Sequence, residues 1–247
     1  MSVWRSALFN VVFYVNLAVF LVGGFMFFFT PRKWSVRALQ VWGQTSVWWL
    51  ERIVGTRMEV RGREHIPQQG CIIAGKHQSA WDTFAILPLL NDPAVVMKRE
   101  LMVIPFYGWF SMKFKMIGID RTAGAGALKR MVAEAREAVR EGRHLLIFPE
   151  GSRRAPDALP DYKPGASAIY LGTGAPCVPF GLNSGLFWPR RQFIRRPGTI
   201  IIEFLPAIPP GLNRRAFEQR LEADIEGSTR RLVAEGRAQL AREGHTL

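Results

Sequence analysis

The sequence predicts an α/β fold: a mostly parallel, mixed sheet flanked by helices, with an N-terminal membrane-associated helical hairpin. Three observations support this prediction. Short aliphatic runs alternate with helical segments after Gly55, as is typical of a parallel sheet. Several of these runs are continuously apolar, like strands that are covered on both faces. Before Gly55 the chain instead carries two long apolar or aromatic segments. We therefore expect a membrane-anchoring hairpin over residues 1–55 and an α/β domain over residues 56–247.

The first N-terminal segment, from Asn10 to Thr30, contains no charged residue. About twenty apolar residues suffice to cross the hydrocarbon core of a bilayer. A cleaved signal peptide is the alternative, but the apolar run is long for one, and no small-x-small cleavage site precedes Arg32 and Lys33. We favour a retained membrane segment, which either spans the bilayer or dips into one leaflet.

The second segment, from Trp34 to Val54, is aromatic but too polar to span a bilayer easily. Its tryptophans lie among charged and amide side chains, a composition that suits the headgroup boundary. Because only Thr30–Lys33 separate the two segments, we expect them to form a hairpin. The alternative is that the second segment is a core helix packed on the domain, since tryptophan is also a frequent core residue.

The α/β domain is expected to contain six strands and two long covering helices. Apolar, β-branched runs predict the strands, which are Arg57–Gly62, Cys71–Gly75, Ala94–Lys98, His144–Glu150, Ala175–Leu182 and Thr199–Leu205. Amphipathic periodicity predicts helices over Gly126–Gly142 and Arg214–Glu243. Neither an internal repeat nor a long linker interrupts this pattern.

The formal net charge of +13 fits nucleic acid, an anionic membrane surface or a phosphorylated substrate. The apolar N-terminus argues against nucleic acid. The basic cluster Trp188–Arg196 suits anionic lipid or an acidic partner, although it equally fits a solvated surface. Cys71 and Cys177 lie in apolar runs and indicate small core residues in a reducing compartment. We therefore expect the domain to face the cytoplasm.

His77 and Asp82 are the leading candidate catalytic residues, because they follow the apolar run Cys71–Gly75 directly. Polar residues at the carboxyl end of a buried strand are where sites gather in α/β sheets. A histidine can take a proton from a hydroxyl while a carboxylate fixes its tautomer. Residues five apart lie about 140° apart around a helix, so His77 is expected on the loop or at the first cap position, and Asp82 one turn into a helix that Gln78 or Ser79 begins. Helix capping is the alternative role for this pair.

A second candidate site is the segment Phe148–Arg154, which also follows a buried strand. Its glutamate, glycine, serine and two arginines suit recognition of a phosphate and the neighbouring hydroxyls. An ordinary exposed turn is the alternative. The remaining histidines, His65, His144 and His245, have no ligand partners at metal-binding spacing, so no metal site is expected.

Four sequence blocks occur in an order and spacing that resembles the glycerolipid acyltransferase family, especially its bacterial 1-acylglycerol-3-phosphate acyltransferases. The blocks are HQSAWD, KRELMVIPFYGW with IDR beyond it, FPEGSRR and VPFGLN, and they extend over about Lys76 to Asn183. The preceding hairpin also resembles that family's membrane anchor. Lys76 departs from the pattern, because many members have asparagine at this position.

The resemblance implies a role for each matching residue. His77 would be the general base and Asp82 its partner. The substrate-binding residues would be Lys98, Arg121, Glu150, Gly151, Ser152 and Arg153, with Arg121 a cation for the substrate phosphate. Val178 and Pro179 would support packing near the acyl chain.

The implied reaction moves an acyl group from acyl-carrier protein or coenzyme A to the sn-2 hydroxyl of 1-acyl-sn-glycerol 3-phosphate, a membrane lipid, giving phosphatidic acid. No cofactor beyond the thioester co-substrate and no acyl-enzyme would be needed. The implied location is the bacterial inner membrane, with the domain on its cytoplasmic face. Two alternatives stay open: acylation of another lyso-lipid, such as lyso-ornithine lipid, and an inactive membrane-bound scaffold.

Overall fold

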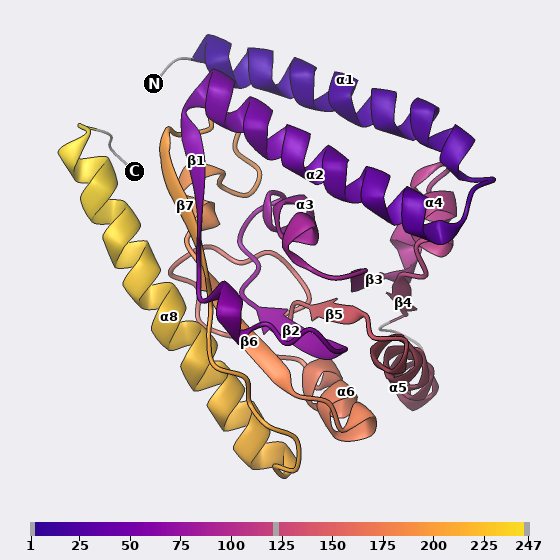
Figure 1. The fold of residues 1–247 in the computed structure, drawn as a ribbon. Helices are drawn as coiled ribbons and strands as arrows, with labels where there is room; N and C mark the ends of the chain where they lie inside the picture. Colours follow the sequence, from indigo (N-terminus) through magenta and orange to yellow (C-terminus); the bar gives the residue numbers. More distant parts are fainter. Residues whose placement is uncertain (1–2, 121–123, 245–247) are drawn as a thin grey trace.

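The computed structural model describes residues 3–120 and 124–244, and a mixed sheet organises the domain (Figure 1). Within these ranges the strand order is β1-β7-β6-β2-β5-β3-β4. All neighbouring strands run parallel except β6 and β7. The fold class predicted from the sequence is confirmed. The strands are β1 Thr56–Arg61, β2 Cys71–Gly75, β3 Ala94–Lys98, β4 Ile117–Ile119, β5 His144–Ile147, β6 Cys177–Leu182 and β7 Gly198–Phe204.

Two strand features were not predicted. Strand β4 has only three residues, too few to give a pattern, and it pairs with β3 alone. Strand β7 is antiparallel to β6 because a short helix and a loop join them at the same end of the sheet, whereas a parallel pair needs a crossover. The predicted fourth strand ends early, at Ile147, because the chain turns into a loop at Phe148–Glu150.

Helices cover both faces of the sheet, and strand β2 shows why both faces are apolar. Successive side chains of a strand point to opposite faces. Cys71 and Ile73 belong to the core cluster beneath α2 and α3, whereas Ile72 and Ala74 belong to the cluster beneath α5 and α6. The helices are α1 Val3–Phe27, α2 Arg32–Val54, α3 Asp82–Ala85, α4 Tyr107–Lys113, α5 Gly124–Arg140, α6 Gly165–Thr173, α7 Ser184–Phe187 and α8 Arg214–Arg242, with 3-10 turns η1 Arg63–His65, η2 Leu87–Leu89 and η3 Arg99–Val103.

The predicted N-terminal hairpin is present as α1 and α2, and α2 lies between α1 and the domain (Figure 1). The side chain of Asn16 donates to Thr45 and Ser46, which joins the two helices by polar contacts. The inner face of α2 also packs on the domain core, as the core-helix alternative expected. The hairpin and the packing of the second segment on the domain are therefore both confirmed, and its place at a headgroup boundary stays a prediction. The division at residue 55 remains a prediction; α2 ends at Val54, but the core cluster that contains Leu50 continues into the domain.

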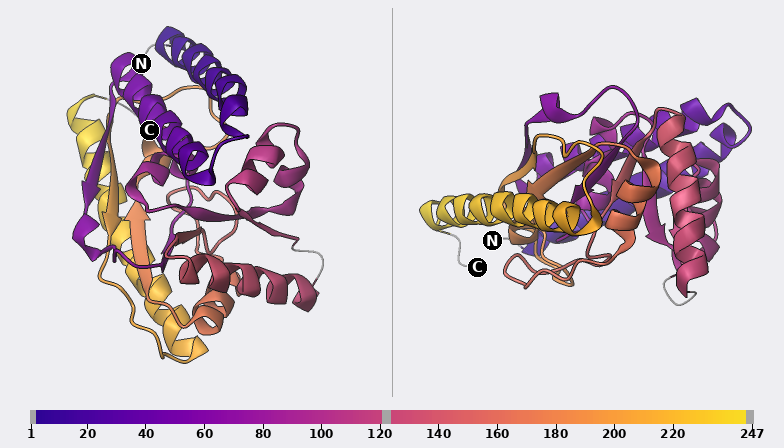
Figure 2. Two further views of the ribbon diagram at one scale, coloured as in Figure 1. Left: turned by 45° about the vertical axis from the view of Figure 1, so that its right-hand side comes forward. Right: turned by 90° about the horizontal axis from the view of Figure 1, so that it is seen from below.

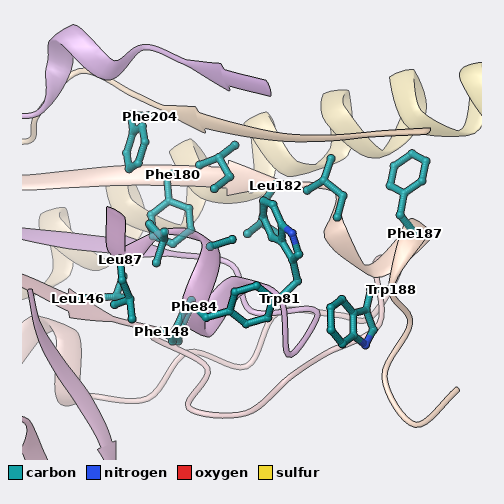
Figure 3. Packing of buried hydrophobic residues seen from close by; sticks show 14 of the residues in the cluster. Trp81, Phe84, Leu87, Leu146, Phe148, Phe180, Leu182, Phe187, Trp188 and Phe204 are labelled. Carbon is teal, nitrogen blue, oxygen red and sulfur yellow. The ribbon is translucent and has the colours of Figure 1, made fainter. Parts of the chain in front are cut away.

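An aromatic cluster fixes the hairpin against the domain. Phe13 of α1 lies 5.4 Å from Phe84 and 5.8 Å from Trp188, measured between ring centroids. Figure 3 shows Phe84 and Trp188 close to Trp81 inside this core. In contrast, the outer face of α1 is largely exposed, and α1 is the one described helix long and apolar enough to cross a membrane. One side of the hairpin is therefore packed against the domain, and the other side is apolar and exposed.

Candidate active site

His77 and Asp82 are brought together by the loop between β2 and α3. Asp82 is the first residue of α3, so the helix begins later than expected, but His77 lies on the loop as predicted. His77 Nδ1 lies 2.9 Å from Asp82 Oδ2. The same oxygen accepts the backbone N–H groups of Gln78 and Ser79, at 2.7 and 2.9 Å. A capping carboxylate would accept N–H groups that follow it, whereas Asp82 accepts from residues that precede it, so it closes the loop.

The second oxygen of Asp82 is bound by a residue that sequence reasoning missed. The hydroxyl of Ser184 donates to Asp82 Oδ1 at 2.5 Å, and the carboxylate is buried. Asp82 is thereby fixed from both sides. An acceptor at Nδ1 assigns the proton of neutral His77 to that nitrogen and leaves Nε2 able to accept one. The pair therefore has the geometry of an oriented general base.

The loop after β5 packs directly on His77. The ring of Phe148 stacks on the imidazole with centroids 4.1 Å apart and planes 20° apart. The backbone N–H of Arg154 donates to the carbonyl oxygen of His77 at 2.8 Å. Gly151 has a φ of +65°, a conformation that glycine adopts without steric cost, and this permits the turn. The two predicted site segments therefore form a single unit.

His77 lines a cavity of about 990 Å³ whose wall has two chemical parts. The apolar part comes from both hairpin helices, β3 and α4. The polar part includes the predicted residues Lys98, Gly151, Ser152 and Arg153, together with Lys163 and Arg190, which were not predicted as substrate ligands. The predicted ligand Arg121 lies outside the described residues.

A buried ion group lies next to this unit. Lys76 is fully buried, and its ammonium lies 3.1 Å from Glu150 Oε1 and 2.7 Å from Glu226 Oε1. The hydroxyl of Tyr162 donates to the same Glu226 oxygen at 3.0 Å. Burial raises the pKa of Glu150, although Lys76 opposes the shift. This ion group links Lys76 at the end of β2, and Glu150 and Tyr162 in the loop after β5, to Glu226 of helix α8.

Three of the described residues that were predicted for the site do not line the cavity. Glu150 was predicted to bind substrate, but its carboxylate is buried on Lys76, so its placement supports the loop instead. Val178 and Pro179 lie within β6, paired with Ile73 and Ala74 of β2, and neither lines the cavity wall. Their predicted packing role fits this position, and their nearness to an acyl chain stays a prediction.

The basic cluster Trp188–Arg196 divides between three environments. Arg190 lines the cavity. Arg195 is half-buried against α1, where its guanidinium donates to Asn10 and lies over the Trp188 ring, and burial lowers its pKa. Arg196 donates to the carbonyl of Leu186. Only part of the cluster is therefore available to a lipid surface or an acidic partner.

The two cysteines are buried, in surroundings that do not suit a nucleophilic thiol. Burial raises the pKa of the Cys71 thiol to about 12, and it also raises the pKa of Cys177. A thiol in such surroundings stays protonated and inert. The two residues are free thiols in the core, as the sequence predicted.

The fold and the site together define a class of enzyme: an α/β protein in which a histidine, oriented by a buried carboxylate, acts on an amphipathic molecule in a cavity with apolar and cationic walls. Such a site suits general-base activation of a hydroxyl group. The neighbouring Phe148–Arg154 loop supplies Arg153 to the wall of the same cavity, which suits an anionic group on the same molecule.

Comparison with known proteins identifies the family. The acyltransferase family model matches residues 57–183. The chain is 32% identical over 242 residues to the 1-acyl-sn-glycerol-3-phosphate acyltransferase of Pseudomonas aeruginosa, a match that covers 96% of this chain and 93% of that protein. The chain therefore belongs to the acyltransferase family, and the resemblance drawn from its motifs is confirmed.

More distant relatives agree with this assignment. The 1-acyl-sn-glycerol-3-phosphate acyltransferase of Limnanthes alba is 31% identical over 158 residues, covering 63% of this chain and 56% of that one. The crystal structure of the 1-acyl-sn-glycerophosphate acyltransferase of Thermotoga maritima superposes with a TM-score of 0.78 at 24% identity. That superposition covers 94% of this chain and 98% of the other, so the fold, hairpin included, is shared.

Proposed function

We propose that this chain transfers an acyl group from an acyl thioester to the sn-2 hydroxyl of 1-acyl-sn-glycerol 3-phosphate, giving phosphatidic acid. One observation carries the proposal: His77, oriented by Asp82, lines a cavity whose wall is apolar on the hairpin side and cationic at the loops. A lysophosphatidate has the matching parts, namely an acyl chain, a hydroxyl and a phosphate. The names of the relatives in Pseudomonas and Limnanthes support the same substrate.

In the first step His77 Nε2 takes the proton of the sn-2 hydroxyl while that oxygen attacks the thioester carbonyl. The tetrahedral intermediate then collapses, the carbon–sulfur bond breaks, and the imidazolium returns the proton to the leaving thiolate. Asp82 stabilises the imidazolium between these steps and keeps Nδ1 protonated. The substrate is itself the nucleophile, so no acyl-enzyme forms.

The cationic wall would bind the acceptor phosphate. Lys98, Arg153, Lys163 and Arg190 line the cavity with positive charge, and the last donates to the backbone carbonyl of Arg153. Charge-assisted hydrogen bonds to a phosphate would convert its binding energy into alignment of the hydroxyl. The backbone N–H groups of Gln78 and Ser79 already donate to Asp82, so they do not serve as an oxyanion hole.

We further propose that the enzyme acts at the bacterial cytoplasmic membrane, with the domain on the cytoplasmic face. The inner helix α2 is packed on the domain, so α1 runs along the protein and its exposed apolar face suits one leaflet. The buried free thiols of Cys71 and Cys177 fit a reducing compartment. The donor thioester, carried by acyl-carrier protein or coenzyme A, would enter from the aqueous side, and no other cofactor is required.

The test is acyl transfer by purified protein with lysophosphatidate and each donor in turn. His77→Ala is expected to lower kcat by roughly 10²–10⁴-fold, the usual contribution of a general base, without unfolding the protein. Near-normal transfer by a folded His77→Ala variant would show that the base has been misassigned.

A second arm tests the acceptor. Arg153→Gln is expected to raise KM for lysophosphatidate and to leave a phosphate-free lyso-lipid, such as lyso-ornithine lipid, unaffected. Preference of the wild type for the phosphate-free acceptor would instead establish the other lyso-lipid reaction. Inactivity of the wild type with every donor and acceptor would point to a scaffold.

A further inference from the structure

An exposed apolar surface lies on η3 and α4, outside the cavity. Four side chains of this segment are prominent: Val103 is 78% exposed, Phe106 50%, Trp109 45% and Met112 56%. They fall within ten consecutive residues. A surface helix normally carries polar residues on the face turned away from the core. A concentrated apolar patch of this kind marks an interaction surface.

We propose that this segment, residues 99–113, is a second bilayer-contacting element that inserts into the interface of the same leaflet as α1. The proposal rests on the proposed function in one respect, namely that the substrate is a membrane lipid. The partner is an anionic lipid surface.

The inner face of the segment is packed, so the outer side chains are held in place. Phe110 is buried against Phe114, with ring centroids 5.8 Å apart, and both belong to a small apolar cluster with Val36 of α2. Because the inner face already has its partners, folding leaves no internal position for Trp109 and Met112. Their exposed surfaces are therefore available to a partner outside the chain.

Local backbone geometry also turns Phe106 outward. Its φ of +62° and ψ of −56° place it at the centre of a tight three-residue turn, closed by a hydrogen bond of 2.7 Å from Tyr107 N–H to Pro105 carbonyl. This conformation is rare and strained for a residue with a side chain. The Phe106 ring nevertheless lies exposed, 5.0 Å from the Trp109 ring. A paired phenylalanine and tryptophan on a tight turn suit the headgroup boundary.

The patch is continuous with the hairpin. Helix α4 lies beside the α1–α2 turn in Figure 1 and in the left view of Figure 2. The ammonium of Lys113 donates to the carbonyl of Thr30 at 2.8 Å and lies over the Phe28 ring, which in turn contacts Phe110. On the hairpin side Met26 and Phe29 are exposed as well. A leaflet that receives α1 therefore meets α4 without rearrangement of the protein.

Charge favours lipid over a second copy of this chain. Between Lys98 and Lys115 the sequence has four cations and one acid, Glu100; Glu141 pairs with Lys115, and the segment keeps a positive excess. Cations beside a membrane are stabilised by anionic lipid. Two copies that met through this surface would instead place the same cations opposite each other. Leu101, Tyr107 and Ser111 of the same segment line the cavity, so a docked α4 would set the rim of the cavity at the lipid surface.

The experiment places a nitroxide label on the patch in the full-length protein, reconstituted in vesicles of phosphatidylcholine and phosphatidylglycerol. Val103→Cys carries the label, and Leu159→Cys, which is 85% exposed on the domain, is the matched control. The native cysteines are buried and would not compete for the reagent. The label at 103 is expected to collide with oxygen more than with a water-soluble nickel chelate, and the label at 159 to show the opposite preference.

Equal access of the nickel chelate to both labels would overturn the proposal, and so would spin–spin broadening at 103 that identifies a second copy as the partner. This readout needs no turnover, so its failure is distinct from failure of the proposed reaction. A kinetic arm compares Phe106→Ser/Trp109→Ser with Leu159→Ser/Leu171→Ser. We expect about a tenfold loss with lysophosphatidate in vesicles for the first pair alone. Activity on a monomeric short-chain acceptor should be unchanged, and a loss there would show that the residues act in the site.

Discussion

Replacing Lys76 by methionine tests the buried ion group most directly. The ammonium is fully buried and contacts Glu150 and Glu226 at 3.1 and 2.7 Å. Methionine removes the charge while filling most of the same space. Removal of one partner of a buried ion pair costs roughly 3–5 kcal/mol, because the remaining charge is left without compensation. Glu226 keeps its bond to Tyr162 and is partly exposed, so the free energy of unfolding should fall by about 3 kcal/mol, the lower end of that range.

The loss should depend on pH in a defined direction. Burial already raises the pKa of Glu150, and removal of Lys76 takes away the group that opposes this shift. A carboxyl whose pKa is raised on folding binds more protons in the folded state. Its favourable contribution is complete below its unfolded pKa of about 4.3 and is lost as pH rises through the folded value. Lys76→Met should therefore be destabilised less at acidic pH than at alkaline pH.

Unfolding followed by circular dichroism in detergent, at one acidic and one alkaline pH, measures both effects. Lys76→Met/Glu150→Gln is the control, since it removes the stranded charge and should recover about half of the lost stability, or roughly 1.5 kcal/mol. The reasoning is refuted if the double variant is as unstable as Lys76→Met, or if the loss is the same at both pH values.

Two further predictions concern the support of the site and helix α8. Ser184→Ala removes the hydrogen bond to Asp82 Oδ1 but leaves the contact between Asp82 and His77. We expect kcat to fall several-fold, which corresponds to a barrier increase of roughly 1 kcal/mol, with little change in KM. An unchanged kcat in steady-state assays would mean that Ser184 does not position the pair. Gly236→Ala should destabilise the protein, because the added Cβ would lie 2.7 Å from the Leu186 side chain. Gly227→Ala is the control in the same helix: its added Cβ meets nothing within 4 Å, and the variant should be more stable than the wild type by about 0.5–1 kcal/mol. Thermal unfolding of both variants compares them, and equal shifts would contradict the packing argument.

Much of the fold was predictable because its signals are local. Apolar runs located six strands, and the amphipathic pattern located α5 and α8 to within about two residues at each end. The apolar N-terminal segment was found too, although α1 begins at Val3 and not at Asn10. Strand β4 and the antiparallel pairing of β7 were not found, because they depend on how distant elements meet.

The site divides in the same way. His77 and Asp82 are five residues apart, so their spacing and position after a strand were enough to identify them. Ser184 reaches Asp82 across 102 residues, and Glu226 reaches Lys76 across 150. No local pattern reports such contacts. Glu150 was recognised as part of a motif, but its burial on Lys76 follows from tertiary packing and could not be inferred from the motif itself.

The loop that holds Asp82 has a consequence for how this enzyme can diverge. Three of the groups that Asp82 binds lie in residues 77–79, so the proton-transfer pair is assembled almost entirely within a six-residue stretch. The cavity wall is supplied by other segments, including α1, β3 and α4. Substitutions in those segments can change which lipid is accepted without disturbing the base. The preference for an acyl chain or headgroup can therefore change during evolution while the catalytic pair is kept.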